Sequence, residues 1–197
     1  MIDLKKFIIS DTEYLKVMPE PIGKDDCEIC AKCDIDYVNE EKNIIIRFGY
    51  DHTSSFCYTI AESGFIQKII EGKNTLNPNI GDLGFEWNQY FQGIIKDTDV
   101  DKYLFCTNSH KQIRPYFSSW IYNDKDGNII FEITPFYPWH AETKKSHADF
   151  ITYKQFMKNY KPTLKTIIQK KYITKWIDQA KELKKTLIDN LQHHNND

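Results

Sequence analysis

Arginine is the residue type that this sequence most lacks. Only Arg47 and Arg114 occur among the 26 basic residues of the 197-residue chain. Because arginine makes most bidentate contacts to guanine and to phosphate, its scarcity argues against sequence-specific DNA binding. Glycine is also sparse, with 8 residues, and neither a Walker loop nor a Gly-x-Gly-x-x-Gly motif is present. Nucleotide binding therefore has no support in the sequence.

Long apolar runs are missing as well. No stretch approaches the roughly 20 apolar residues that a membrane-spanning helix needs, and the short apolar patch Phe7–Ile9 is not followed by the cleavage site of a secretion signal. The five cysteines are an odd number, which favours reduced thiols over a disulfide framework. We expect a soluble, cytoplasmic protein with one domain over residues 1–197, because 41% hydrophobic residues can form a core of that size.

Residues 1–139 read mainly as strands. β-Branched and aromatic runs predict strands at 43–50, 55–60 and 102–106. Two further runs within 116–134 flank a short loop that contains Gly127, which predicts a β-hairpin. Less regular patterns predict short helices at 64–72 and 84–95. Together these segments predict an antiparallel sheet.

The last third changes to a helical period. Thr152 and Gln155 have the spacing of a capping box, and Pro162 ends or separates the helix that follows. A second helix carries an apolar stripe at Ile173, Trp176, Ile177, Ala180, Leu183, Leu187 and Leu191. We expect an α+β fold in which the sheet packs against a helical layer at residues 150–193.

Three cysteines form a C-x2-C-x2-C run at Cys27, Cys30 and Cys33. An iron–sulfur motif would need a fourth cysteine at the position of Tyr37, and a zinc site would need a second pair. Residues 27–37 instead alternate between apolar and polar, as in a half-buried strand. Cys27 and Cys33 would then face the core and Cys30 the solvent, so the thiols would not converge on a metal. A redox role for exposed Cys30 is the other alternative.

Two groups of residues suit nucleophilic catalysis. His52 precedes Cys57, and Cys106 precedes His110, so either thiol could be paired with an imidazole in a small hydrolase. Working triads assemble in space and share no fixed order along the chain, and there is no Gly-x-Ser-x-Gly elbow. The plainer interpretation is a core cysteine beside a loop histidine.

Templates for metal-dependent chemistry fit poorly. Glu132 lacks the lysine expected two residues later in a nuclease, and we expect it on the solvent face of the hairpin. His140 and His147 are too far apart for the His-Glu-x-x-His geometry. We therefore predict no metal site and no cofactor. An aromatic cluster serves either hairpin packing or an interface, and its members are Tyr116, Phe117, Trp120, Tyr122, Phe136, Tyr137 and Trp139.

The charge is divided unequally along the chain. Residues 144–185 hold twelve lysines and three acidic residues, a local charge of +9, which leaves −11 for the rest of a chain whose net charge is −2. Such a division steers a charged partner, although both stretches could simply be solvated faces. The lysine-rich helices could also lie on anionic lipid or RNA.

The C-terminal region carries three short elements: Pro-Phe-Tyr-Pro-Trp at 135–139, Tyr-Lys-Pro at 160–162 and Trp-Ile-Asp-Gln-Ala at 176–180. On these elements the chain resembles a family of uncharacterised bacterial proteins and, more loosely, the immunity proteins of bacterial toxin systems. The resemblance implies a non-catalytic protein that binds and neutralises a cognate toxin.

An acidic surface would suit a basic toxin domain, because complementary charge speeds association and selects the partner. The acidic residues that we predict to contact such a partner are Asp25, Asp26, Glu28, Asp34, Asp36, Glu40 and Glu41. The Cys/His hydrolase remains the alternative function.

Overall fold

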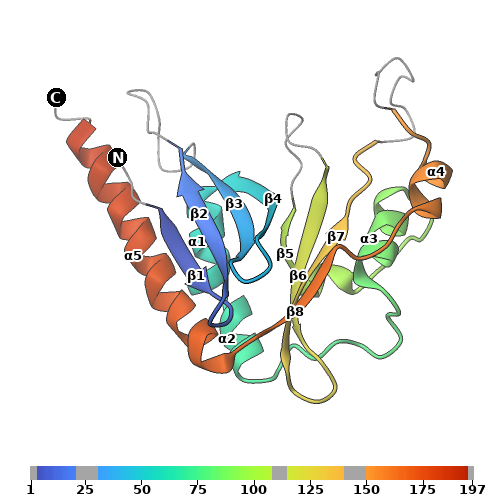
Figure 1. Ribbon diagram of the computed structural model, residues 1–197, viewed down its shortest axis with the longest axis horizontal. Helices are drawn as coiled ribbons and strands as arrows, with labels where there is room; N and C mark the ends of the chain where they lie inside the picture. The colour runs from blue at the N-terminus through green and yellow to red at the C-terminus, as the bar shows by residue number, and fades with distance from the viewer. Residues whose placement is uncertain (1–3, 21–30, 108–114, 140–149, 195–197) are drawn as a thin grey trace.

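The computed structural model describes residues 4–20, 31–107, 115–139 and 150–194. Its strands form two four-stranded antiparallel sheets, ordered β1-β2-β3-β4 and β5-β6-β7-β8 (Figure 1). With the helices around them they make an α+β architecture, as predicted. The strands are divided between two sheets, however, where the sequence suggested one.

The first sheet consists of β1 (Lys5–Ile8), β2 (Glu13–Pro19), β3 (Lys32–Asn39) and β4 (Ile44–His52). The alternation seen in the sequence places Cys33, Ile35 and Tyr37 of β3 in the core. A bulge between Ile35 and Asp36 shifts the register against β4. Cys33 is fully buried, as predicted, whereas Cys27 and Cys30 lie outside the described residues.

Three helices contribute to the apolar cluster on the core side of this sheet. They are α1 (Thr53–Ala61), α2 (Phe65–Ile70) and α5 (Lys170–His194). The strand predicted at 55–60 is wrong, because these residues belong to α1. Phe56, Cys57 and Ile60 are buried on one helical face while Tyr58 is exposed, so the 3.6-residue period outweighed the β-propensity of the run.

The second sheet consists of β5 (Leu104–Thr107), β6 (Phe117–Asn123), β7 (Ile129–Pro135) and β8 (Leu164–Ile168). The predicted β6–β7 hairpin is confirmed. Strand β8 corrects the prediction of an all-helical layer at 150–193, because it pairs with β7. Its five residues follow Pro162 and are too few to show a period that separates strand from helix.

Shorter helices flank the second sheet. A 3₁₀ helix (Val100–Tyr103) leads into β5, and α3 (Leu83–Phe91) lies against β7. Helix α4 (Tyr153–Lys158) begins with the predicted capping box, in which Thr152 and Gln155 bond each other's backbone N–H. The predicted helices at 64–72 and 84–95 correspond to α2 and α3.

Two apolar clusters fill the molecule. The larger joins the inner faces of both sheets to α1, α2 and α5, and the ring of Phe131 contacts those of Tyr37 and Phe48 between the sheets. The smaller lies on the opposite face of the second sheet, where Trp120 and Tyr122 pack below the 3₁₀ helix and α3. Trp120 and Tyr122, with Phe117, Phe136 and Tyr137, are buried, which favours packing as the role of most of the aromatic cluster.

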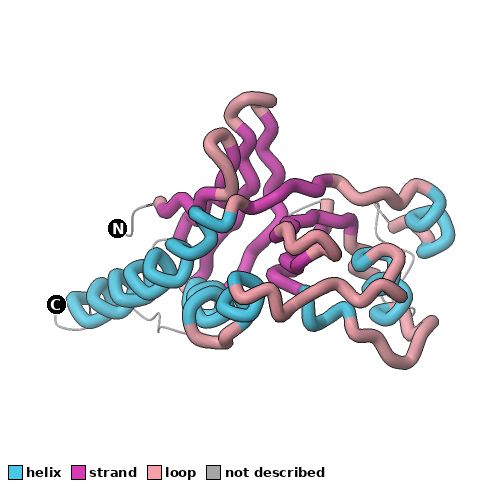
Figure 2. The backbone as a smooth tube through the Cα atoms, turned by 90° about the horizontal axis from the view of Figure 1, so that it is seen from below, coloured by secondary structure: helices cyan, strands magenta, loops and turns pink. Residues whose placement is uncertain are grey.

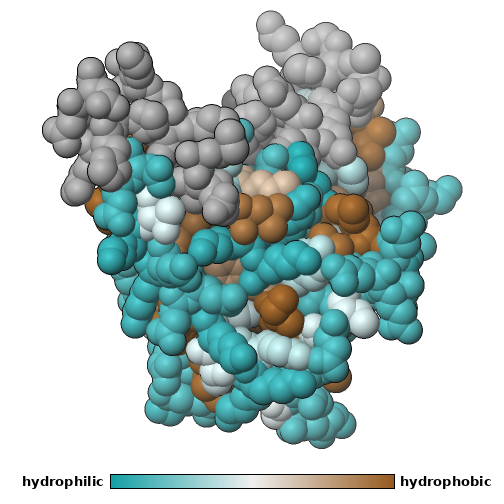
Figure 3. Space-filling model, turned by 60° about the vertical axis from the view of Figure 1, so that its left-hand side comes forward, coloured by the Kyte–Doolittle hydropathy of each residue, from teal (hydrophilic) through white to brown (hydrophobic). Residues whose placement is uncertain are grey.

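The predicted stripe of α5 faces the core: Ile173, Trp176, Ala180, Leu183 and Leu187 are fully buried. The helix runs beside β1, and α1 packs against it (Figures 1 and 2). The side of the molecule that includes α5 is mostly hydrophilic, with small separate hydrophobic patches (Figure 3). No helix among the described residues is long and apolar enough to cross a bilayer.

Candidate functional site

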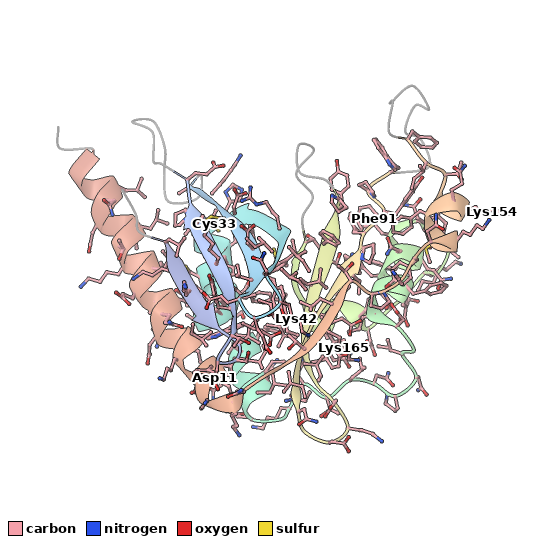
Figure 4. All side chains as sticks on the ribbon, viewed as in Figure 1. Asp11, Cys33, Lys42, Phe91, Lys154 and Lys165 are labelled. Carbon is pink, nitrogen blue, oxygen red and sulfur yellow. The ribbon has the colours of Figure 1, made fainter. Side chains whose placement is uncertain are left out.

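The described cysteines lie in the core. Cys33, Cys57 and Cys106 are at most 6% exposed, and Cys33 lies within the first sheet (Figure 4). Burial raises the pKa of the Cys57 thiol to about 12 and raises the pKa of Cys33 as well. A raised pKa keeps a thiol protonated near neutral pH, whereas the thiolate is the nucleophile. The buried environment therefore opposes catalysis by either thiol.

Of the two candidate histidines, only His52 is described, and no described hydrogen bond joins it to a thiol. His52 occupies the N-cap position of α1 without capping it by its side chain, and its Nδ1 atom is buried with no hydrogen-bond partner in the described structure. The charges that act on Cys57 belong to Lys184 and Glu62. His110 lies outside the described residues.

Arg47 forms ion pairs with two of the acidic residues that we predicted to contact a partner. Its Nε donates to Asp36 Oδ1 at 2.8 Å and its Nη2 to Asp36 Oδ2 at 3.3 Å, while Nη1 lies 3.0 Å from Asp34 Oδ2. Asp36 is only 4% exposed. The alternation of residues 27–37 predicts that Asp36 faces water, and this prediction is wrong, because the Arg47 side chain from β4 covers the carboxylate.

The acidic residues in the turn after β3 are less closely paired with basic residues than Asp34 and Asp36 are. Lys6 Nζ lies 3.4 Å from Glu40 Oε1, whereas Glu41 is exposed and has no ion pair among the described residues. Asp25, Asp26 and Glu28 lie outside the described part of the chain. The predicted acidic surface is thus partly compensated by basic residues that the sequence pattern did not place beside it.

Arg47 belongs to the open face of the first sheet, by which we mean the face opposite the core. Across the four strands one row consists of Lys6, Lys16, Asp36 and Arg47. The next row consists of Ile8, Tyr14, Val38 and Ile45. The apolar cluster that contains α1, α2 and α5 lies behind the sheet, and no described helix crosses the open face (Figures 1 and 2).

Side chains on the open face are held in defined positions. Lys6 Nζ lies 4.0 Å from the ring centroid of Tyr14, a distance suited to a cation–π contact. Ile45 is 68% exposed and adds an apolar surface. The face therefore combines an anchored arginine, a tyrosine and an exposed aliphatic side chain.

Glu13 connects this sheet to the second one. Its carboxylate accepts hydrogen bonds from Tyr37 Oη at 2.5 Å, Asn39 Nδ2 at 2.9 Å, Thr166 Oγ1 at 2.9 Å and Ser10 Oγ at 3.0 Å. Burial opposes ionisation of Glu13, but the hydrogen bonds outweigh it and lower the pKa. Because Thr166 belongs to β8, the carboxylate fixes the two sheets to each other.

A second polar cluster is buried under α3. Tyr122 Oη donates to Glu132 Oε2 at 2.8 Å, and Lys165 Nζ lies 3.7 Å from the same atom. Glu132 is 5% exposed and burial raises its pKa, so the prediction that it faces solvent is wrong. The face of the hairpin that we expected to contact solvent is covered by the segment around α3. The hairpin sequence alone does not indicate this covering.

An apolar hollow of about 410 Å³ lies beyond the end of β7. It is lined by Pro115, Tyr116, Pro135, Phe136, Tyr137, Pro138, Trp139, Ile151 and Phe156. The Tyr137 hydroxyl donates to the Ile151 carbonyl at 2.8 Å, so this polar atom is already used. The hollow offers apolar contact, with little to orient a reacting substrate.

Metal chemistry also lacks a site in the described ranges, where no three His, Cys, Asp or Glu side chains are grouped to hold an ion. The feature that sequence reasoning missed is Arg47. Its signal was available, since it is one of two arginines and lies in a predicted strand, but register with Asp36 depends on the bulge in β3. No protein-family model matches this sequence, and searches of curated proteins and of solved structures found no significant match.

Proposed function

We propose that this protein is a non-catalytic binding protein that docks a protein partner on the open face of the first sheet. The observation that carries the proposal is Arg47, held between Asp34 and Asp36 on a sheet face that no described helix covers. Arginine and tyrosine are enriched among the residues that dominate binding energy. Side chains already held in place lose less conformational entropy on binding.

The charge of this face refines the acidic-surface hypothesis. Lys6, Lys16 and Arg47 balance Asp34, Asp36 and Glu40 across the described strands. A balanced face selects a partner by its pattern of charges and apolar groups more than by its net charge. Exposed Glu41 would supply a further contact to a basic partner. Asp25, Asp26 and Glu28 stay predicted contacts, because they lie outside the described residues.

Within this proposal the partner is a toxin domain and the protein acts as its immunity protein. The support is that the elements at 135–139, 160–162 and 176–180 resemble a family of uncharacterised bacterial proteins, which in turn loosely resembles the immunity proteins of toxin systems. Neutralisation would follow from occupying the toxin surface, and would need no catalytic group in this chain. The buried thiols are consistent with such a role.

The test uses the full chain as bait in the native host, followed by calorimetry with the purified partner. Ile45→Asp and Lys16→Glu change the open face, and Lys175→Glu and Lys181→Glu change exposed positions on α5 as matched controls. We expect the open-face variants to weaken binding about tenfold or more and the controls to stay within about twofold. If the affinity for the partner is the same for all open-face variants as for the wild type, the proposed surface is wrong. If the protein does not protect cells from that partner, the immunity role is wrong.

A further inference from the structure

The segment that runs through α4 and β8 to the start of α5 is strongly basic. Between Asp149 and Asp178 the chain has no acidic residue. We call five exposed lysines of this segment the lysine ribbon: Lys154, Lys158, Lys161, Lys165 and Lys170. Lys171 and Lys175 are exposed as well, but Lys171 is paired with Asp11 and Lys175 lies further along α5. Lys154 extends outward from α4, and Lys165 lies on β8 (Figure 4).

Little in the described structure neutralises the lysine ribbon. Lys165 is 3.7 Å from Glu132, at the long end of an ion pair, and its side chain is 59% exposed. The other four lysines have no ion pair with a described residue. A surface with several uncompensated cations attracts an anionic partner over distances of about a Debye length.

Strand β8 adds a second feature beside these charges. It is the last strand in the order β5-β6-β7-β8, so only one of its edges pairs with a described strand. Ile167 is 51% exposed and shares a face with Lys165. An edge strand can pair its outward N–H and C=O groups with an extended peptide. Such pairing would end before Gln169, whose N–H donates to the Ile9 carbonyl at 3.0 Å.

Other anionic partners suit the ribbon less well. RNA recognition favours arginine and free aromatic rings, but the ribbon has no arginine, and the rings of Tyr153, Phe156 and Tyr160 contact other aromatic rings. Lipid binding would need an apolar helix face. Helix α4 has six residues, and its aromatic side chains pack against Tyr137.

We infer that the edge of β8 and the lysine ribbon bind an extended, acidic segment of a protein partner. Backbone hydrogen bonds to β8 would give the segment its register, Ile167 would contact an apolar residue, and the lysines would pair with its carboxylates. This surface belongs to the second sheet and is separate from the open face of the first. It therefore stands whether or not the open face is the docking site for a toxin.

The experiment measures binding of a labelled twelve-residue peptide, in which glutamate alternates with valine, by fluorescence anisotropy. A second peptide of equal charge has proline in place of three valines, which prevents strand pairing. We expect the first peptide to bind with an affinity that falls as salt rises, and the second to bind at least about tenfold more weakly.

Two variants test the surface in the full chain. Lys154→Glu/Lys158→Glu/Lys161→Glu reverses the ribbon without removing a described ion pair, and Ile167→Asp changes β8 itself. Each should lower the affinity about tenfold or more, while the α5 triple variant Lys175→Glu/Lys181→Glu/Lys185→Glu stays within about twofold. Circular dichroism and the thermal midpoint show whether each variant is folded.

The outcomes that would overturn the inference are distinct. They are absence of saturable binding to the glutamate–valine peptide, equal affinity for the proline peptide, and equal losses in the ribbon and α5 variants. Stronger binding of a uridine oligonucleotide or of phosphatidylserine vesicles, abolished by the ribbon variant, would reassign the lysines to nucleic acid or lipid.

Discussion

Arg47 and Asp36 face each other across β3 and β4, and both oxygens of the buried carboxylate accept hydrogen bonds from the guanidinium. The side chain of Asp36 is 6% exposed and that of Arg47 is 42% exposed. In this pair the buried carboxylate of Asp36 therefore holds the partly exposed guanidinium of Arg47 in position. It fixes the one arginine among the described residues on a surface that no described helix covers.

Replacing Asp36 with asparagine should destabilise the protein. The variant keeps the volume of the side chain but leaves Arg47 without its closest counter-charge, and partial exposure of Arg47 limits the loss to about 1–2 kcal/mol. Urea denaturation measures the change in the free energy of unfolding. Glu41→Gln, at an exposed position with no described ion pair, should change it by less than about 0.5 kcal/mol. Equal effects of the two changes would contradict the anchoring role of Asp36.

Glu13 should make stability fall in acid. Burial opposes its ionisation, but its four hydrogen-bond donors lower its pKa in the folded protein. A lowered pKa in the folded state means that the contribution is complete above the unfolded value of about 4.3 and is lost as the pH falls through the folded value. Wild type should exceed Glu13→Gln in stability near pH 7, and the difference should shrink towards pH 3 in urea titrations. A difference independent of pH would show that the charge of Glu13 is not what the donors stabilise.

Gly84 should tolerate no side chain. A Cβ atom there would lie 2.2 Å from Thr134 Oγ1 and 2.4 Å from Tyr160 Oη. Gly84→Ala must therefore move α3 away from β7, which carries Thr134, or from the segment before β8, which carries Tyr160. We expect a loss of about 2 kcal/mol or more in thermal or urea unfolding. Gly81→Ala is the matched control, because nothing lies within 4 Å of its added Cβ. Similar stabilities for both variants would mean that α3 is not packed as closely as described.

The buried thiols should be unreactive in the folded protein. With Cys27 and Cys30 replaced by serine, a thiol-specific reagent near neutral pH should label Cys33, Cys57 and Cys106 only after denaturation, because all three are buried. Burial also raises the pKa of Cys33 and of Cys57, which disfavours their reactive thiolate forms. Rapid labelling of Cys57 in the native state, slowed by His52→Ala, would instead favour the Cys/His hydrolase.

Predictions of helices and strands were right where one hydrophobic period dominated a segment. They were wrong where the hydrophobic period and the β-propensity of the residues favoured different structures. Helix α5 was evident because its apolar residues recur at helical spacing over many turns and are buried as expected. At 55–60 the aromatic and β-branched residues favoured a strand, but burial of Phe56, Cys57 and Ile60 against α5 decided for a helix. Local propensity is weak compared with the burial of a whole helical face.

Residue periodicity alone indicated the α+β composition, the hairpin, the α5 stripe and the core position of Cys33, and the residue counts indicated the concentration of lysines from Lys144 onward. Four features followed from contacts between distant elements: the strands form two sheets, Arg47 covers Asp36, Glu13 holds β8, and Glu132 is buried. Periodicity reports which side of an element is apolar, but it carries no information about which distant element lies against that side. The candidate surfaces depend on such long-range neighbours, because the environment of each charge is set by strand order and register.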